Sequence, residues 1–322
     1  MFALNPKIFD IDVASKPTRD GFGTGLIAAG DANEHIVALC ADLIESTRVE
    51  AFAKKYPNRF FEMGVSEQNM AGVAAGLATT GKIPFAVSYA VFSPGRNWDQ
   101  IRVSVAYSNL NVKIVGAHAG ISVGPDGATH QALEDIAIMR VLPGMVVLVP
   151  CDALEAERAT RAAATYDGPV YLRLTREKTP IITTPETEFE IGRAYVVRPG
   201  KNISIIACGP LLHEALKAAE LLKKENIDAE VINCPTISPL DEKTILGSLK
   251  KTGAAVTVEE HQISGGLFGA IAECSARSTF PVPIQPVGMP NCFGESGTPT
   301  ELLEKYGMTA ADIVRATKKA LK

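Results

Sequence analysis

The chain has 322 residues, of which 46% are hydrophobic, and a formal net charge of −4 with both signs spread along its length. This composition excludes a disordered chain and predicts a folded globular protein with room for two domains. With positive and negative charges this evenly spread, the sequence has no basic cluster that would bind nucleic acid. No apolar stretch is long enough to span a bilayer. We therefore expect neither a nucleic-acid partner nor a membrane partner.

The six cysteines lie far apart and form no CxxC pair. Because most of them stand in buried-looking runs, the pattern indicates reduced structural thiols and a cytoplasmic protein. The first twenty residues, MFALNPKIFDIDVASKPTRD, contain no basic region followed by a long apolar run. We therefore expect no signal peptide.

Short apolar, β-branched runs alternate with helix-like segments through the first half of the chain. The predicted strands are 35–39, 83–87, 111–117, 144–149 and 169–174. The predicted helices are roughly 18–31, 46–55, 66–80, 95–108, 132–140 and 152–166. Near-continuous apolar strands that alternate with helices predict a parallel sheet covered on both faces.

The pattern breaks over 175–192, where prolines, acidic residues and the lack of a helical period indicate a linker. A second α/β unit follows, with strands near 203–208, 228–234, 254–260 and 283–288 and helices near 211–225, 241–250, 266–276 and 309–321. We predict an α/β protein of two domains. A parallel-sheet domain covers 1–180, and a smaller, mainly parallel α/β domain covers 190–322.

The stretch GVSEQNM places Glu67 at the start of a helix made of very small apolar residues. In the simplest interpretation Ser66 caps this helix and Glu67 complements its positive end, which contributes about 0.3–1 kcal/mol. The alanines and glycines over 71–78, however, let neighbouring backbone approach on nearly every side, which predicts a helix buried all round. An enclosed carboxyl at its mouth can hold or share a proton near neutrality.

The loop GAHAGISVGPDGATHQALED, residues 116–135, holds His118, Asp126 and His130 between four glycines. A surface turn would account for GPDG. A ligand site is the better interpretation, because two of only five histidines stand in one long polar loop after a buried strand. The separation of the two histidines fits no common zinc pattern and no cysteine is nearby, so we predict no metal site.

Side chains just beyond the carboxyl ends of the predicted strands are candidates for binding, because ligands gather there in parallel sheets. The residues at such positions are Asp42, Tyr89, His118 and Arg176. Aromatic residues such as Tyr89 and Phe92 at a strand end belong more often to a core than to a cofactor site. The glycine-rich GFGTG has neither the lysine of a P-loop nor the preceding strand of a dinucleotide fold, so it predicts a helix start.

Several segments together resemble the C-terminal half of transketolase, in order and with few gaps. They are GVSEQNMAGVAAGLA, YAVFSPGRNWDQIR, GISVGPDGATHQALEDIAIMR, LRLTREKTP and FGESGTPTELLEKYG. The resemblance implies a thiamine diphosphate enzyme that moves a two-carbon ketol unit between sugar phosphates. Residues 1–180 would form its pyrimidine-binding domain and residues 190–322 its C-terminal domain.

The resemblance also implies which residues contact the cofactor. The glutamate that matches Glu67 hydrogen-bonds the aminopyrimidine ring, which requires a residue able to hold a proton. Phe92 matches the aromatic that stacks on this ring, and Tyr89 matches an aromatic beside it. Asp42 matches an aspartate near the cofactor.

A further group of residues would contact the substrate. Asp126 and His130 match residues that contact substrate hydroxyls near the reacting carbons, and with Glu67 they form the expected catalytic set. The residues that match the group holding the sugar phosphate are Arg19, Ser46, His118 and Arg176. Two arginines suit that purpose because a guanidinium binds phosphate oxygens in a fork.

One departure from the family pattern concerns the diphosphate end of the cofactor. A complete transketolase has an N-terminal half that holds the diphosphate through a metal and a Gly-Asp-Gly motif, and no such motif occurs here. We therefore expect one subunit of a split transketolase, whose N-terminal partner subunit holds the diphosphate with Mg²⁺ or Ca²⁺. We also expect a dimer of this chain within a heterotetramer.

A smaller departure from the family pattern is Asn291-Cys292, where the family often has an aspartate before FGESG.

Other functions remain open at this point. The beta subunit of a 2-oxoacid dehydrogenase is a separate chain of similar size, but its substrate carries no phosphate for the arginines to bind. Deoxyxylulose phosphate synthase is closer in substrate but is normally one long chain. A non-catalytic binding or regulatory module is the alternative from another class, and the intact set of Glu67, His118, Asp126 and His130 argues against it.

Overall fold

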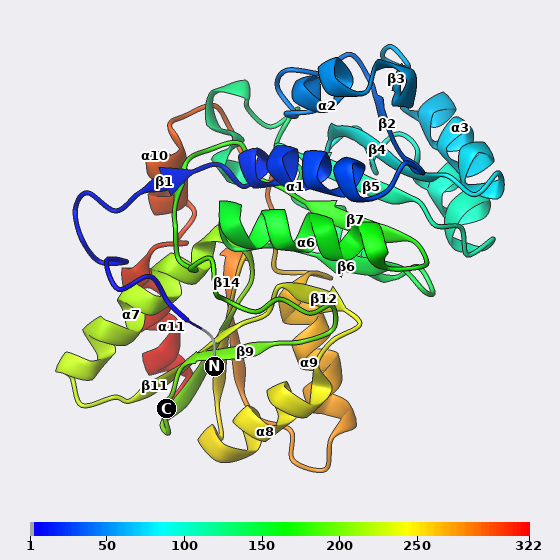
Figure 1. The fold of residues 1–322 in the computed structure, drawn as a ribbon. Coiled ribbons are helices and arrows are strands. Elements are labelled where there is room, and N and C mark those ends of the chain that lie inside the picture. The colour runs from blue at the N-terminus through cyan, green and yellow to red at the C-terminus, as the bar shows by residue number, and fades with distance from the viewer. Residues whose placement is uncertain (1–2) are drawn as a thin grey trace.

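Two large β-sheets organise residues 3–322, the part of the chain that the computed structural model describes (Figure 1). The larger sheet has the spatial order β12 (Thr236–Ser238), β6 (Val146–Leu148), β7 (Val170–Arg173), β5 (Lys113–Ala117), β4 (Ile83–Tyr89), β2 (Ile36–Cys40) and β3 (Phe60–Glu62). All its neighbours pair in parallel except β12, which runs antiparallel to β6. The second half of the chain thus contributes one strand to the sheet of the first half.

The smaller sheet has the order β14 (Ile284–Met289), β13 (Ala255–Gln262), β10 (Ile203–Ala207), β11 (Ala229–Asn233) and β9 (Tyr195–Arg198). It is parallel except for β9, which pairs antiparallel with β11. The predicted α/β class with mainly parallel sheets is confirmed. A short antiparallel pair, β1 (Ser15–Lys16) with β8 (Thr179–Pro180), ties the segment after the larger sheet to the chain just before the first helix.

Helices cover both faces of the larger sheet because its strands are apolar on both sides. One face packs against α1 (Thr18–Ala32), α2 (Glu50–Lys55) and α6 (Ala153–Thr165). Figure 1 shows α1 and α6 side by side across this face. The other face packs against α3 (Glu67–Thr79), the π-helical turn Ile101–Ala106 that follows α4 (Trp98–Gln100), and α5 (Asp135–Arg140).

The smaller sheet is covered in the same way. α7 (Leu212–Lys224) and α11 (Ala310–Ala320) pack on one face, and α8 (Glu242–Thr252) and α9 (Leu267–Arg277) pack on the other. α10 (Pro299–Lys305) lies against the loop that follows β5. One hydrophobic cluster contains residues of α3 and α5 as well as Ile206 and Ile232 of the smaller sheet, so the two halves share a core.

Several element boundaries differ from the sequence prediction. The helix predicted over 46–55 begins only at Glu50, because Arg48 has left-handed backbone with φ 68° and cannot continue a right-handed turn. The helix predicted over 95–108 begins at Trp98. The short elements β3, β9, β12 and α10 were not predicted, because three to seven residues carry too little periodicity. No helix within residues 3–322 is long and apolar enough to cross a membrane.

The expectation that the small-residue helix α3 is buried on all sides is wrong. Met70, Ala71 and Ala74 face the core, but Gly72 and Gly76 lie on an exposed face. A Cβ atom added at either glycine would meet no atom within 4 Å. Small residues permit close approach, but their sequence does not reveal whether the approaching backbone belongs to the same chain.

Candidate active site

Two threonines bring distant segments of the chain to one edge of the larger sheet. Thr175, just after β7, donates its backbone N–H to Thr18 Oγ1 at the start of α1 over 2.7 Å, and the two hydroxyl oxygens are 3.1 Å apart. Both side chains are buried. The residues that follow them, Arg19 and Arg176, consequently line the same cavity of about 500 Å³.

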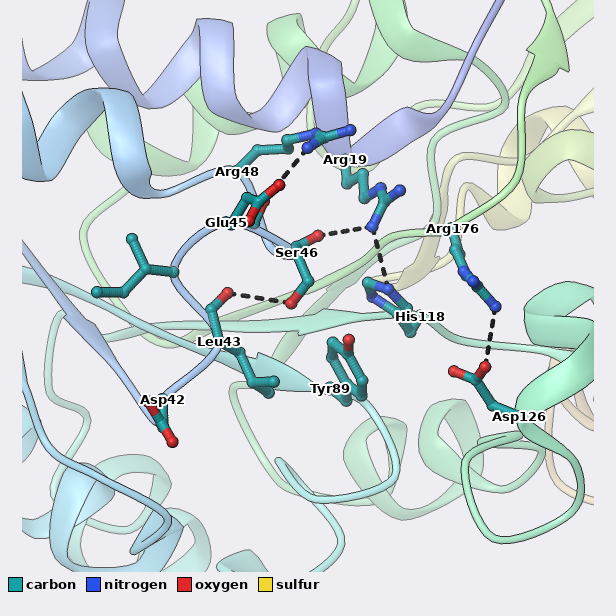
Figure 2. A pocket seen from close by; sticks show the side chains of 11 residues that line it. Arg19, Asp42, Leu43, Glu45, Ser46, Arg48, Tyr89, His118, Asp126 and Arg176 are labelled. Carbon is teal, nitrogen blue, oxygen red and sulfur yellow. Dashed lines mark hydrogen bonds and ion pairs between the residues drawn. The ribbon is translucent and has the colours of Figure 1, made fainter.

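This cavity lies where the strands of the larger sheet end, and Figure 2 shows the side chains that surround it. They include seven of the ten residues that the sequence singled out, namely Arg19, Asp42, Ser46, Tyr89, His118, Asp126 and Arg176. Glu67 lines a different depression of about 530 Å³, together with Arg96 and residues 65–69. Phe92 and His130 line neither depression.

His118 is a neutral imidazole at the back of the cavity. It is only 2% exposed, it has left-handed backbone with φ 55°, and its ring stacks on Tyr89 with centroids 3.8 Å apart. Burial, together with the charges of Arg19 and Arg176, lowers the pKa of His118 to about 3. A guanidinium only donates, so the 3.1 Å contact with Arg19 Nη1 makes Nε2 the acceptor and leaves the proton on Nδ1. Nδ1 is buried and has no hydrogen-bond partner among residues 3–322.

The two arginines from α1 and the β7 loop differ in their partners. Arg19 Nη1 donates to the backbone oxygen of Ser46 over 2.7 Å, and no carboxylate within residues 3–322 pairs with Arg19. Burial and the neighbouring charge of Arg48 lower the pKa of Arg19, and its Nε is buried without a partner. Arg176 Nη1 donates to Asp126 Oδ1 over 3.1 Å. Donors of this kind suit a tetrahedral oxyanion such as phosphate.

Glu67 is held at the mouth of α3 by side chains that the sequence prediction did not include. Its side chain is only 3% exposed, and Arg96 Nη1 lies 3.3 Å from each of its carboxylate oxygens. Asn97 Nδ2 also donates to the backbone oxygen of Glu67 over 3.1 Å. Ser66 does not cap the helix as the simplest interpretation had it, because its hydroxyl donates to the backbone oxygen of Met63 over 2.7 Å.

A row of rings connects the two depressions. The guanidinium of Arg96 lies over the ring of Phe92 at 4.1 Å, and Phe92 stacks against Tyr89 with centroids 6.0 Å apart. His130 stands edge-on to both, 5.4 Å from Phe92 and 6.3 Å from Tyr89. With His118 behind Tyr89, the row leads from Glu67 to the arginines of the cavity.

Asp42 is exposed at the rim of the larger cavity. Its backbone is left-handed, with φ 59°, and Glu62 Oε1 accepts its N–H over 2.7 Å. The same oxygen accepts the N–H of Gly64 over 2.9 Å. One carboxylate therefore fixes both the loop that carries Asp42 and the turn that leads to Glu67.

Arg48 and Arg96 are the site residues that the sequence prediction did not identify. Arg48 falls in a segment predicted to be helical, and Arg96 precedes a helix that begins later than predicted. Two separate arginines carry no sequence signal that would assign them to a site. Within residues 3–322, no group of three or more histidine, cysteine, aspartate or glutamate side chains is placed to hold a metal ion.

Family models match most of the chain. Residues 14–181 match the model "Transketolase, pyrimidine binding domain", and residues 192–313 match "Transketolase, C-terminal domain". The chain belongs to the transketolase family. It corresponds to two of that family's domains, in the order in which the resemblance of its motifs had suggested.

The chain is similar to proteins of two different lengths. A transketolase C-terminal section of Methanocaldococcus jannaschii is 48% identical over 95% of this chain and 97% of its own length. The 6-deoxy-6-sulfo-D-fructose transketolase subunit SqwH of a Clostridium species is 44% identical over 96% of this chain and 95% of its own length. Mouse transketolase-like protein 2 is 41% identical, but the match covers only 48% of its length.

The chain is also similar to solved structures of two different lengths. A structure described as "Split gene transketolase, inactive beta4 tetramer" superposes with a TM-score of 0.89 at 48% identity, over 95% of this chain and 98% of that one. Transketolase from Campylobacter jejuni superposes with a TM-score of 0.81 over 49% of its own chain. At 23% identity, that second likeness shows the fold alone.

Proposed function

We propose that this chain is the C-terminal subunit of a split transketolase, which depends on thiamine diphosphate and transfers a two-carbon ketol unit between anionic sugars. The observation that carries the proposal is the continuous row of site residues from the buried Glu67 to the arginine-lined cavity. One end of this row offers a carboxylate and an aromatic face, and the other end offers donors for an oxyanion. Such a pair of ends suits a cofactor ring and the anionic tail of a sugar.

The Glu67 end fits an aminopyrimidine ring. The planar, N–H-bearing guanidinium of Arg96 already makes the two contacts that such a ring would make, over the face of Phe92 and toward the oxygens of Glu67. Thiamine diphosphate, when bound, supplies the electron sink for breaking a carbon–carbon bond of the ketose. Glu67 would hold a proton at its carboxylate oxygens against the ring, and Arg96 would move aside. Phe92 and Tyr89 would orient the ring and exclude water, with Asp42 at the rim.

A partner chain would complete the cofactor site. The sequence contains no Gly-Asp-Gly motif, and it spans about half the length of the mouse relative. A relative of which it covers 97% is named as a transketolase C-terminal section. We propose that an N-terminal partner subunit holds the diphosphate and its metal, Mg²⁺ or Ca²⁺. The uncovered face of α3 at Gly72 and Gly76 supports association through this region, in a dimer of this chain within a heterotetramer.

The substrate would be a sugar with a terminal oxyanion. Arg19, Arg176 and Ser46 line the cavity, together with the neutral His118. Asp126 and His130, at the junction of the cavity and the ring row, would contact hydroxyls near the reacting carbons. A phosphate is the first candidate for the oxyanion. A sulfonate is the second, because a relative 44% identical is named as a 6-deoxy-6-sulfo-D-fructose transketolase subunit.

The five buried cysteines are all free thiols, which supports the cytoplasmic location we propose.

The test of function is a substrate panel on the chain reconstituted with its partner subunit, thiamine diphosphate and magnesium. The panel contains a ketose phosphate, a sulfo-ketose and pyruvate as 2-oxoacid. We expect ketol transfer to an aldose acceptor from at least one anionic ketose and no decarboxylation of pyruvate. Turnover of pyruvate alone would favour the 2-oxoacid dehydrogenase alternative, and no turnover at all would favour a non-catalytic module.

A further inference from the structure

Arg48 stands in the wall of the cavity in a backbone conformation that an arginine adopts at an energetic cost. Its φ of 68° is left-handed, a region that suits glycine and asparagine far better. Helix α1 packs closely against it, since a Cβ at Gly23 would lie 2.9 Å from the backbone oxygen of Arg48. The fold therefore holds this strained residue in place, two positions beyond Ser46, where its side chain lines the cavity (Figure 2).

The guanidinium of Arg48 is oriented but not fully satisfied. Its Nε donates to Asp20 Oδ1 over 2.7 Å, and its Nη1 donates to the backbone oxygen of Glu45 over 3.3 Å. Its Nη2 makes no hydrogen bond to residues 3–322. The side chain is 39% exposed, so the remaining donor is accessible to a ligand.

The charge of Arg48 acts on the other cationic groups of the cavity. After burial, Arg48 is the strongest of the influences that lower the pKa of Arg19, and it also lowers the pKa of His118. Arg176 acts on both groups in the same direction. The guanidinium groups of Arg48 and Arg176 therefore repel that of Arg19 across one cavity, and an anion placed among them would relieve that repulsion.

We propose that Arg48 is a specificity-determining residue, a third guanidinium donor to the terminal oxyanion that favours a dianionic end group over a monoanionic one. The inference rests on the proposed function, because it concerns the same cavity. It extends that function by assigning the charge preference to one residue. Phosphate and sulfonate share the tetrahedral oxyanion chemistry, and the experiment separates them by their charge.

The preference has a quantitative form. Coulomb energy is proportional to the charge of the ligand, so at equal geometry the loss of Arg48 affects a dianion twice as strongly in free energy. We expect Arg48→Met to weaken binding of a phosphate dianion roughly tenfold and of a sulfonate only about threefold. Methionine is no more strained than arginine at this left-handed position, so the backbone cost cancels in the comparison.

The experiment measures binding without requiring turnover. Methyl phosphate at pH 8, where it is a dianion, and methanesulfonate are titrated calorimetrically into the full chain and into its complex with the partner subunit. The control for Arg48→Met is Arg277→Met. In the wild type, Arg277 Nη2 pairs with Glu242 over 2.7 Å, the same distance as between Arg48 and Asp20, but Arg277 does not line the cavity. Arg48→Lys, which keeps the charge, serves as the conservative variant.

We expect Arg48→Met to lose more affinity for methyl phosphate than for methanesulfonate, Arg48→Lys to retain most of the preference, and Arg277→Met to change neither. Equal losses for the two anions, or no loss, would overturn the proposal. The outcome is separable from the proposed function. A complex that lacks ketol transfer but shows these binding changes would refute the function alone, whereas unchanged binding in an active transketolase would refute only the role of Arg48.

Discussion

The two ends of the candidate site differ in how complete they are within this chain. At the oxyanion end, Arg19 bonds to Ser46 and His118, Arg176 bonds to Asp126, and the Thr18–Thr175 contact fixes both arginines. At the cofactor end, Glu67 is buried, but within residues 3–322 its only charged partner is the half-exposed Arg96. The helix that begins at Glu67 leaves one face uncovered.

This difference indicates what each end requires. The oxyanion end is built from the start of α1 and from loops at one edge of the larger sheet, and its donors all belong to this chain. The cofactor end has the carboxylate and the aromatic face but lacks covering surface. We therefore expect substitutions at the oxyanion end to act on substrate affinity, and substitutions at the cofactor end to act on cofactor chemistry and association.

The largest effect is expected from Glu67→Gln in the reconstituted enzyme. The amide keeps the shape of the side chain but cannot supply the proton that we assign to Glu67. Hydrogen–deuterium exchange at C2 of the bound cofactor should slow by orders of magnitude, with unchanged circular dichroism as the control for folding. Near-normal exchange would reduce Glu67 to a helix-end residue.

The next effect tests the oxyanion end. Arg19→Met and Arg176→Ala should each lower kcat/KM for an anionic ketose about ten- to a hundredfold, since a charge-assisted bond contributes roughly 1.5–3 kcal/mol. The loss should appear mainly in KM, because the oxyanion is remote from the reacting carbons. A neutral ketose of the same carbon skeleton is the matched substrate. Equal losses on both substrates would remove the oxyanion role.

A substitution on the uncovered helix face tests the open end. Gly76→Leu should not lower the thermal stability of the isolated chain, because its side chain would enter open space and leucine favours a helix more than glycine does. It should weaken association with another chain at least about tenfold if that face is covered in the assembly. Gly247→Leu on α8, where a Cβ also meets no atom within 4 Å, is the control. Sedimentation equilibrium of both variants measures the difference, and equal association would show that α3 is not at an interface.

A smaller effect is expected from Arg96→Met. Because Arg96 occupies the contacts with Glu67 and Phe92 that we propose for the cofactor ring, its removal should strengthen thiamine diphosphate binding several-fold. Calorimetric titration of the reconstituted apoenzyme measures this, with the exposed Arg102→Met as control. Weaker binding would mean that Arg96 helps to hold the cofactor rather than competing with it.

The smallest effect concerns the pH dependence of stability. The pKa of His118 is about 3 in the fold, below the value of about 6.5 for an unfolded chain, so the unfolded state takes up the proton first as the pH falls. The neutral ring therefore costs stability progressively between pH 6.5 and pH 3. His118→Asn, which suits the left-handed backbone, should lose about 1 kcal/mol less stability than wild type between pH 7.5 and pH 6. Urea unfolding of both proteins at the two pH values measures this. An equal change in the free energy of unfolding for wild type and His118→Asn would contradict the prediction.

The sequence was most informative where side-chain periodicity is dense. The apolar runs at 35–39, 83–87 and 203–208 predicted β2, β4 and β10 to within two residues. β12 could not be predicted in its place, because it joins the sheet of the other half through a pairing that no local pattern encodes. The exposed face of α3 was predicted to be buried. Small residues indicate that another backbone can approach the helix, but they do not reveal which chain that backbone belongs to.

The site was predictable where its residues belong to a polar loop, follow a predicted strand or match the family pattern. Asp126 and His130 lie in a glycine-rich loop that predicts a ligand site. Arg48 lies in no such motif, and Arg96 lies in a family segment that gave it no assigned role. Their roles depend on tertiary features, the left-handed backbone of Arg48 and the position of Arg96 over Phe92. A single sequence holds no record of either feature.

The most direct test of the account is a comparison of this chain alone with this chain plus a partner subunit that carries the diphosphate-binding half. Ketol transfer is followed in a coupled assay with thiamine diphosphate, magnesium and an anionic ketose donor. We predict no turnover by the single purified chain and full activity on addition of the partner. Full turnover by the chain alone would contradict the claim that its cofactor end is incomplete.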